Sequence, residues 1–469
     1  MYFCMNSISM KYFIILILLS LGISCSSTDK NNGTTYFGGQ IVNPKERYVL
    51  LLKDDNVIDS ITIGKNNIFQ DQYKSLKEGL YTFRHGGEFQ YVYIEPSDSI
   101  LIRLNTWDFD ESLVYSGKGS SKNEFLINLF LENEKEEKFI YNNFHLNEND
   151  FQHKIDSLLT VKTEMYNYFK SNEKDIPEGF TKLIDAAIYF PLYRLKEIYP
   201  YYYRKEHKLD HFPEVSDEFY KFREHINLNE ESLLSFYPYQ NYLVSYLYHI
   251  SYSEKEKDNP QNNLTINVLN SVVNNIQSEE IKNTLLNRIV INDFFKGEST
   301  CKIKDEVLDI FLKNCTNQKY IDKVKNLVND SKCITNKQPL KDFTVVSLSN
   351  HQTTNISDVI KNKNAVIYFW SSEFMSPDYL MNRIKFLEKN HPNILFIGIN
   401  MKKTNEDNEA FINQIAVSKQ FILSDDSYAQ NYISSNYPRV IIVNKKGIVE
   451  NGFTYLDSRN LSKEIEKLH

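Results

Sequence analysis

The chain has 469 residues, enough for about three domains at roughly 150 residues each. Its formal net charge of −7 argues against a nucleic-acid-binding protein, which would carry a basic stripe, so no nucleic acid is expected as a partner. Hydrophobic residues make up 41% of the chain, so packed cores are expected, while the 32 tyrosines and 30 phenylalanines fit either the bias of an AT-rich genome or an aromatic binding surface.

The N-terminus carries the features of a targeting segment. Lys11 precedes an apolar run of about a dozen residues, too short for a comfortable transmembrane span. The run ends in Leu-Gly-Ile-Ser-Cys, which resembles a bacterial lipobox, and the resemblance implies that Cys25 is lipidated after cleavage. We therefore expect residues 1–25 to be a lipoprotein signal peptide and residues 26–34 a flexible polar tether. The mature protein would be anchored to a membrane of the cell envelope, at the periplasmic face or in the outer membrane; a secreted protein with an unlipidated cysteine is the alternative.

Short apolar runs separated by turn residues predict β-structure over residues 35–120. The run at 48–52 is one strand, and residues 57–63 alternate apolar and polar side chains, the period of a half-buried strand. Many short strands punctuated by Gly, Asn, Asp and Pro predict a β-sandwich. The other expected strands are residues 81–84, 91–95, 100–104 and 113–115.

Residues 121–335 predict an α-helical region. Ile266, Leu269 and Val273 fall on one helix face, and glycine and proline are rare in this part of the chain. No motif in the region assigns it a function.

Two clusters within the helical region invite a chemical interpretation. His207 and His211 have the spacing of a metal-binding helix face, but the Phe-Pro pair that follows indicates that the helix ends there, so we expect a solvated segment and no metal site. The tyrosines at 201–203 could stack on sugar rings, although packing of amphipathic tyrosines is favoured. The sequence has no phosphate-binding or dinucleotide-binding motif, so no cofactor is expected.

Three cysteines remain if the N-terminal ones belong to the signal peptide and the lipid anchor. Cys301, Cys315 and Cys333 show no Cys-x-x-Cys spacing. In an oxidising envelope they could form one disulfide with one free thiol, or all three could stay reduced. Their spacings lack the paired-ligand pattern of a zinc site.

The C-terminal part, residues 336–469, carries a strong resemblance to a known family. An apolar run at 365–370 predicts a buried strand, a helical pattern follows, residues 394–400 predict a second buried strand, and Pro438 precedes a third. This order resembles thioredoxin domains of the TlpA/ResA type. The resemblance implies a thioredoxin-like fold and a cis peptide bond before Pro438, facing the active site.

The N-terminal part resembles the β domain that precedes TlpA-like thioredoxins in Bacteroidetes lipoproteins. The matching features include Gly39 in the first strand and Ser-Gly-Lys-Gly-Ser at 116–120 ahead of Asn123 and Glu124. Together the patterns predict a multidomain α+β and α/β protein: a β-sandwich, a helical middle region and a thioredoxin-like domain.

The redox site implied by the resemblance has lost its thiols. A thioredoxin needs a thiolate at a helix N-terminus, where the helix dipole lowers its pKa, and a resolving thiol one turn later. In a gap-free alignment these positions hold Phe374 and Pro377, and proline is tolerated in the first turn of a helix. Tyr368 stands where the family often has a buried polar group for proton transfer. No catalytic residue is expected, because Ser376 has no positioned base and fits a helix N-cap instead.

The parts of the motif that survive predict binding without redox chemistry. The expected docking surface for a protein or peptide partner consists of Trp370, Met375, Ser376, Tyr437 and Pro438. Two alternatives remain open: a thiol–disulfide pathway protein that uses the three cysteines outside the motif, and a glycan- or peptide-capturing protein that uses the aromatic helical region.

Overall fold

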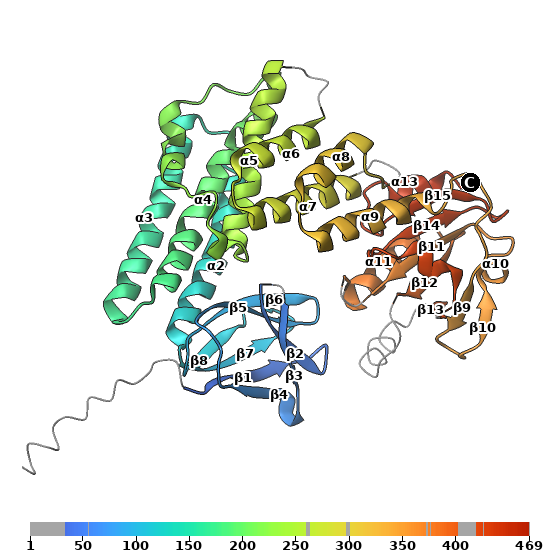
Figure 1. The fold of residues 1–469 in the computed structure, drawn as a ribbon, viewed down its shortest axis with the longest axis horizontal. Helices are drawn as coiled ribbons and strands as arrows, with labels where there is room; N and C mark the ends of the chain where they lie inside the picture. The colour runs from blue at the N-terminus through green and yellow to red at the C-terminus, as the bar shows by residue number, and fades with distance from the viewer. Residues whose placement is uncertain are drawn as a thin grey trace, which may run out of the picture.

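The computed structural model describes residues 33–54, 56–258, 263–296, 301–371, 374–375, 377–401, 419–424 and 426–468. The predicted signal peptide with Cys25, nearly all of the predicted tether, and Ser376 lie outside the described residues. Within these ranges the chain runs from a β-rich part through a helical part to a mixed α/β part (Figure 1). None of the helices in them combines the length and the apolar character that crossing a membrane requires.

Two four-stranded sheets form the N-terminal part. One has the order β4-β1-β7-β8, with β1 (Thr35–Val42), β4 (Ile68–Tyr73), β7 (Ser99–Asn105) and β8 (Val114–Lys118). The other has the order β3-β2-β5-β6, with β2 (Tyr48–Lys53), β3 (Asn56–Thr62), β5 (Gly79–His85) and β6 (Glu88–Ile94). The pair β1 and β7 is parallel, and the other pairs are antiparallel.

Both sheets contribute side chains to one hydrophobic core. In β7 the buried residues Ile100, Ile102 and Leu104 alternate with more exposed ones, as in a strand with one face in a core. Leu51 and Phe83 reach the same core from the other sheet. Alternation thus predicts the covered face of β7. In β3, however, where alternation was also expected, Val57 and Ile58 are exposed and only Ile61 is buried.

Gly39 is required by the close approach of β7. Its φ of 153° is rarely adopted by L side chains, and a Cβ at this position would lie 2.0 Å from the carbonyl oxygen of Ile102. Gly39 and Ile102 are direct partners in the parallel ladder. The glycine noted in the first strand therefore allows two backbones to pair.

Asn123 and Glu124, which follow the glycine-rich stretch 116–120, join the β-rich part to the first long helix, α2 (Ser120–Tyr141). Asn123 accepts a hydrogen bond from the backbone N–H of Tyr93 at 2.6 Å and donates one to its carbonyl at 2.9 Å. Glu124 accepts one from the N–H of Tyr115 at 2.5 Å. Because β6 lies at the edge of its sheet, Asn123 satisfies backbone groups that would otherwise lack a strand partner.

Helices occupy most of the middle part. They are α2, α3 (Glu148–Asn172), α4 (Glu178–His207), α5 (Tyr237–Asp258), α6 (Leu264–Asn275), α7 (Glu279–Phe295), α8 (Asp305–Asn314) and α9 (Gln318–Lys332), with 3-10 turns at Asp217–His225 and Glu231–Leu233. Several begin at a side chain that caps the first turn: Asn147 accepts from the N–H of Asp150, and Ser278 from that of Ile281.

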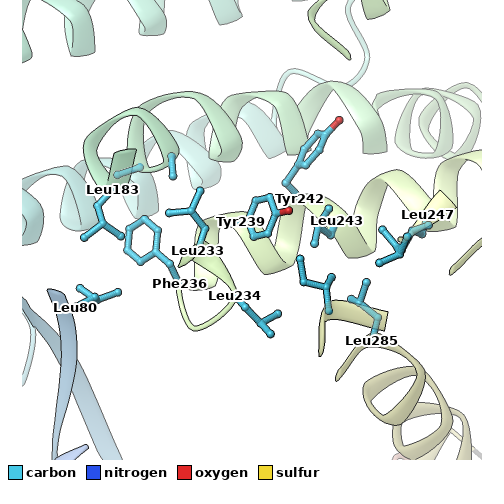
Figure 2. Packing of buried hydrophobic residues seen from close by; sticks show 14 of the residues in the cluster. Leu80, Leu183, Leu233, Leu234, Phe236, Tyr239, Tyr242, Leu243, Leu247 and Leu285 are labelled. Carbon is cyan, nitrogen blue, oxygen red and sulfur yellow. The ribbon is translucent and has the colours of Figure 1, made fainter. Parts of the chain in front are cut away.

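A large hydrophobic cluster holds the middle part together and joins it to the β-rich part. Figure 2 shows Leu183, Leu233, Phe236 and Tyr239 packed between helices, with Leu80 of β5 at the margin of the cluster. Tyr93 of β6 belongs to the same cluster. The helical part therefore shares a core with one edge of the β-rich part.

The C-terminal part is a seven-stranded mixed sheet in the order β10-β9-β13-β12-β11-β14-β15. The elements are β9 (Thr344–Ser347), β10 (Thr353–Asn355), α10 (Ile356–Val359), β11 (Ala365–Trp370), α11 (Pro377–Asn390), β12 (Leu395–Asn400), β13 (Gln420–Leu423), a 3-10 turn at Tyr428–Tyr432, β14 (Val440–Val443), β15 (Val449–Thr454) and α13 (Leu461–Glu466). β11, β12 and β13 run parallel, and β14 is antiparallel to β11.

The central strand β11 is buried on both faces, as its unbroken apolar run predicts. Val366, Tyr368 and Trp370 face α11 and α13, where they pack against residues such as Leu380 and Leu461. The alternate residues of the strand face a second cluster on the other side of the sheet. This sheet, covered on two sides, positions the stretch that follows Trp370.

Candidate functional site

The stretch that lacks the two cysteines lies between the end of β11 and the start of α11. The backbone N–H groups of Phe374 and Met375 both donate to the carbonyl of Ser371, at 3.1 and 3.2 Å, which forms a tight turn. Pro377 is the first residue of α11, the place in a helix where a missing N–H costs least. Phe374 is 46% exposed, and its ring centroid lies 5.8 Å from that of Tyr437.

Two members of the expected docking surface lie inside the protein. Trp370 is 1% exposed and Met375 is 9% exposed, and both belong to the cluster between the sheet and α11. The reason is that β11 is a central strand with both faces covered, so its last side chain has no route to the surface. Phe374, Tyr437 and Pro438 are the members of the site with exposed or half-buried side chains.

A buried amide links the two aromatic residues below the site. Gln420 of β13 donates from Nε2 to the hydroxyl of Tyr368 at 2.6 Å and accepts at Oε1 from the indole Nε1–H of Trp370 at 3.0 Å. Burial raises the pKa of Tyr368, and the hydrogen bond from Gln420 offsets only part of that effect. Tyr368 is therefore a neutral structural group, not a proton carrier near neutral pH.

Gly398 of β12 makes room for that amide. A Cβ on Gly398 would lie 2.1 Å from Oε1 of Gln420, and the two residues are direct partners in the ladder between β12 and β13. Sequence reasoning missed Gln420 altogether. Gly398, inside an otherwise apolar strand, was the one local signal for Gln420, because a glycine within a strand often marks a place where another group approaches the backbone closely.

The cis peptide bond implied before Pro438 is not present, since the described residues contain no cis peptide bond. The next residue, Arg439, lies in the loop that leads into β14. Its carbonyl still accepts from the N–H of Phe369 at 2.8 Å, so the loop stays paired to β11. Its side chain, however, turns into the protein and is 1% exposed.

Backbone carbonyls from three segments hold the buried guanidinium of Arg439. Nη1 donates to the carbonyls of Asp330 at 2.9 Å and Tyr432 at 2.7 Å, and Nη2 donates to the carbonyl of Gly452. The guanidinium carbon also lies 4.3 Å from the ring centroid of Phe453. Arg439 thus connects the loop of the candidate site to the last helix of the middle part.

Asp330 of α9 completes this connection. Its fully buried carboxylate accepts four hydrogen bonds: from the N–H and hydroxyl of Ser434 at 3.0 and 2.5 Å, and from those of Ser435 at 2.9 and 2.5 Å. Charge-assisted hydrogen bonds of this kind are the strong ones in proteins. The helical part and the C-terminal part are therefore joined by a buried polar contact directly behind the loop that carries Tyr437.

The helical part also covers one side of the loop. Phe295, the last residue of α7, has its ring centroid 5.4 Å from that of Tyr437, and Nζ of Lys323 in α9 lies 4.8 Å from the same ring. In the part of the chain that is described, Phe374 approaches Tyr437 from the thioredoxin-like side. The exposed surface at this loop is accordingly smaller than expected and centres on Phe374.

Cys301, Cys315 and Cys333 are free, which matches the alternative of three reduced cysteines. Cys315 packs in the helical core, and Cys301 packs beside Phe294 and Phe453. Burial raises the pKa of the Cys315 thiol and that of Cys301 to about 12. Cys333 is an exposed residue whose sulfur is partly desolvated, which raises its pKa, while the guanidinium of Arg439 at 3.5 Å opposes that effect.

The two clusters singled out in the helical region do not form as units. His207 ends α4 with its Nε2 2.9 Å from the carbonyl of His145, and no group of metal-binding side chains occurs in the described ranges. Tyr202 stacks on Phe144 at 4.7 Å within a core cluster, whereas Tyr201 stays exposed. A platform of three parallel tyrosines is therefore absent from this part of the chain.

Neither a protein-family model nor a curated protein matches the sequence. Solved structures resemble part of the chain. The thioredoxin domain of a thiol-disulfide oxidoreductase from Bacteroides vulgatus is 17% identical over 29% of this chain and 97% of its own, with a TM-score of 0.24. A thiol:disulfide interchange protein from Bacteroides sp. is 17% identical over 29% of this chain and 90% of its own, with a TM-score of 0.23. A secreted disulfide oxidoreductase from Mycobacterium tuberculosis is 17% identical over 27% of this chain and 96% of its own, with a TM-score of 0.21.

The strand order, independent of these likenesses, defines the fold of the C-terminal part. Parallel β11 and β12 joined through α11, followed by the antiparallel hairpin of β14 and β15, form a thioredoxin-like domain. These likenesses cover less than a third of the chain.

Proposed function

We propose that this protein is a lipoprotein of the cell envelope whose thioredoxin-like domain lacks dithiol chemistry and binds a protein or peptide partner. The pair Phe374 and Pro377, at the two positions where the resembling family has cysteines, carries the proposal. Residues 334–469 hold no cysteine, so this domain can neither attack nor resolve a disulfide. The membrane anchor at Cys25 and the β-sandwich nature of the N-terminal part belong to the same proposal.

The position of Phe374 supports partner binding. In open α/β sheets, ligands bind outside the carboxyl ends of the parallel strands. Phe374 follows the carboxyl end of β11 and keeps 46% of its surface exposed beside the half-buried Tyr437. Exposed aromatic residues of this kind act as anchors in protein interfaces.

A thiol–disulfide role for the remaining cysteines has less support. The thiols are free, and burial raises their pKa values, whereas a reactive cysteine needs a lowered one. The binding hypothesis needs none of them.

Site-specific photo-crosslinking in the bacterium that makes the protein tests this proposal. A benzoylphenylalanine is placed at position 374 in one strain and at position 386 in another. Phe386 is a matched control because it is a phenylalanine in α11 with 53% of its surface exposed. We expect a discrete adduct with one protein from position 374, no such adduct from position 386, and a weaker adduct when Tyr437→Ala is added.

An insulin-reduction assay on the mature protein completes the test. We expect no turnover above the rate with the chemical reductant alone. Clear catalytic turnover, or equal crosslinking from both positions, would overturn the proposal.

A further inference from the structure

The helical part contains a cavity that the proposed function does not use. It has a volume of about 400 Å³ and lies between the end of α4, the 3-10 turn Asp217–His225 and α5. These helices belong to the middle part of the chain (Figure 1), whereas Phe374 lies in the thioredoxin-like domain. A volume of this size is in the range of small-molecule sites.

A buried ion pair forms the polar base of the cavity. The carboxylate of Glu197, which is fully buried, accepts from Nε of Arg223 at 2.9 Å and from Nη2 of the same residue, and it lies 2.8 Å from Nδ1 of His249. Burial alone would raise the pKa of Glu197, but the hydrogen bonds from His249 and Arg223 outweigh it and lower the pKa. Both members of the pair are therefore ionised, and their charges cancel.

Aromatic rings form the walls. The ring centroids of Tyr201 and Tyr252 are 5.9 Å apart, and Phe212 meets Tyr252 edge to face at 5.8 Å. Tyr220 lines the base, and its hydroxyl has no hydrogen-bond partner among the described residues. The cavity thus combines flat apolar faces with a small number of polar groups, the composition of a specific ligand site.

The charges around these rings decide which ligands fit. The guanidinium of Arg223 lies 4.0 Å from the centroid of Tyr220 and is neutralised by Glu197, so the base offers a cationic ligand no unpaired carboxylate. Arg204, whose guanidinium lies 4.9 Å from the centroid of Phe212, adds a positive charge behind the wall. An anionic ligand would meet Asp217 at the rim and an arginine already paired with Glu197. A neutral ligand avoids both conflicts.

We propose that this cavity binds a neutral saccharide. The C–H bonds on one face of a pyranose ring carry small positive partial charges and pack on the negative face of an aromatic ring such as Tyr201 or Tyr252. Hydroxyl groups of the sugar both donate and accept, so they can bond to the partly exposed guanidinium of Arg223 and to the carboxylate of Asp217 at the rim without adding a charge. Of the tyrosines at 201–203 considered from the sequence, only Tyr201 lines the cavity, and Tyr252 supplies the second ring.

Saturation-transfer difference NMR on the mature protein tests this proposal. The neutral probes are the methyl β-glycosides of glucose, galactose and N-acetylglucosamine, together with cellobiose. We expect saturation transfer to at least one of them and roughly three- to tenfold weaker binding in Tyr201→Ala, because an aromatic contact of this kind is lost. Tyr201 is 44% exposed, so its removal leaves the helical core intact.

Tyr168→Ala is the matched control, since Tyr168 is an exposed tyrosine on α3 that does not line the cavity. The control should bind the saccharide as the unchanged protein does. Choline, glucuronate and N-acetyltyrosine amide serve as cationic, anionic and neutral aromatic competitors. Absence of binding to every neutral saccharide, equal binding by Tyr201→Ala, or displacement of the saccharide by one of the competitors would each refute the proposal.

Discussion

Gln420 is a single polar side chain on which the centre of the thioredoxin-like domain depends. It is placed between Tyr368 and Trp370, two buried aromatic residues of the central strand, and it bonds to both. A hydrogen bond between buried groups adds little net stability when made, but leaving one partner unsatisfied costs about 1–3 kcal/mol. The amide of Gln420 therefore holds both aromatic side chains in place at the centre of the sheet.

We predict that Gln420→Leu lowers the free energy of unfolding by about 1–3 kcal/mol, because the hydroxyl of Tyr368 loses its donor and the indole of Trp370 loses this acceptor. Urea unfolding followed by fluorescence measures the change. The chain has two tryptophans, and Trp107 is 77% exposed, so a Trp107→Phe background leaves Trp370 as the reporter of its own environment.

Gln70→Leu supplies the control, because Gln70 is an exposed glutamine in β4 and exposed substitutions change stability by only about 0.5 kcal/mol. Gly398→Ala should lower the free energy of unfolding as Gln420→Leu does, since its Cβ displaces the amide. Equal stability of Gln420→Leu and Gln70→Leu would show that the buried amide is dispensable.

At the scale of elements, an ion pair buried between helices specifies how α2 and α3 pack. Nζ of Lys162 in α3 lies 2.6 Å from Oε2 of Glu136 in α2, and both side chains are almost fully buried. Burial raises the pKa of Glu136 and lowers that of Lys162, effects that their mutual attraction offsets only in part. Desolvation thus disfavours the charged forms of both side chains, and each charge is stabilised in the interior only by the other.

We predict that Lys162→Met destabilises the protein by about 3–5 kcal/mol, because it leaves the carboxylate of Glu136 buried without its counter-ion. The double variant Glu136→Leu with Lys162→Met should recover most of that loss, because neither charge is then buried. Thermal unfolding of the single and double variants measures both effects.

Lys182→Met, which breaks an exposed pair with Glu178 in α4, is the control and should lower the free energy of unfolding by no more than about 0.5 kcal/mol. A double variant no more stable than Lys162→Met would refute the account.

The elements themselves were largely predictable, since local pattern determines them. The apolar run at 365–370 coincides with β11, and Pro377 opens α11 as its residue type allows. The contacts that position the site were not predictable. Gln420 lies 50 residues from Trp370, and Asp330 lies 104 residues from Ser434, so neither pairing leaves a trace in local periodicity. For the same reason Trp370 was expected at the surface, although its strand is buried.

At the scale of the molecule, α9 joins the helical part to the thioredoxin-like domain. Asp330 brings a buried carboxylate to Ser434 and Ser435, and its main chain accepts from Arg439. Phe294 and Leu327 add an apolar contact with Phe453.

We predict that Asp330→Ala loosens this junction without unfolding the β-rich part. Four hydrogen bonds disappear, and the buried Arg439 loses the negative charge that offsets its own, a loss of about 3–5 kcal/mol. In hydrogen exchange, amides of α9 and of residues 428–440 should exchange roughly 100-fold faster or more, whereas those of residues 35–118 should not change. Asp322→Ala, an exposed position in the same helix, should leave all rates as they are. Unchanged exchange at 428–440 in Asp330→Ala would mean that the apolar contact alone joins the two parts, because the serine and arginine contacts would then contribute nothing to the junction.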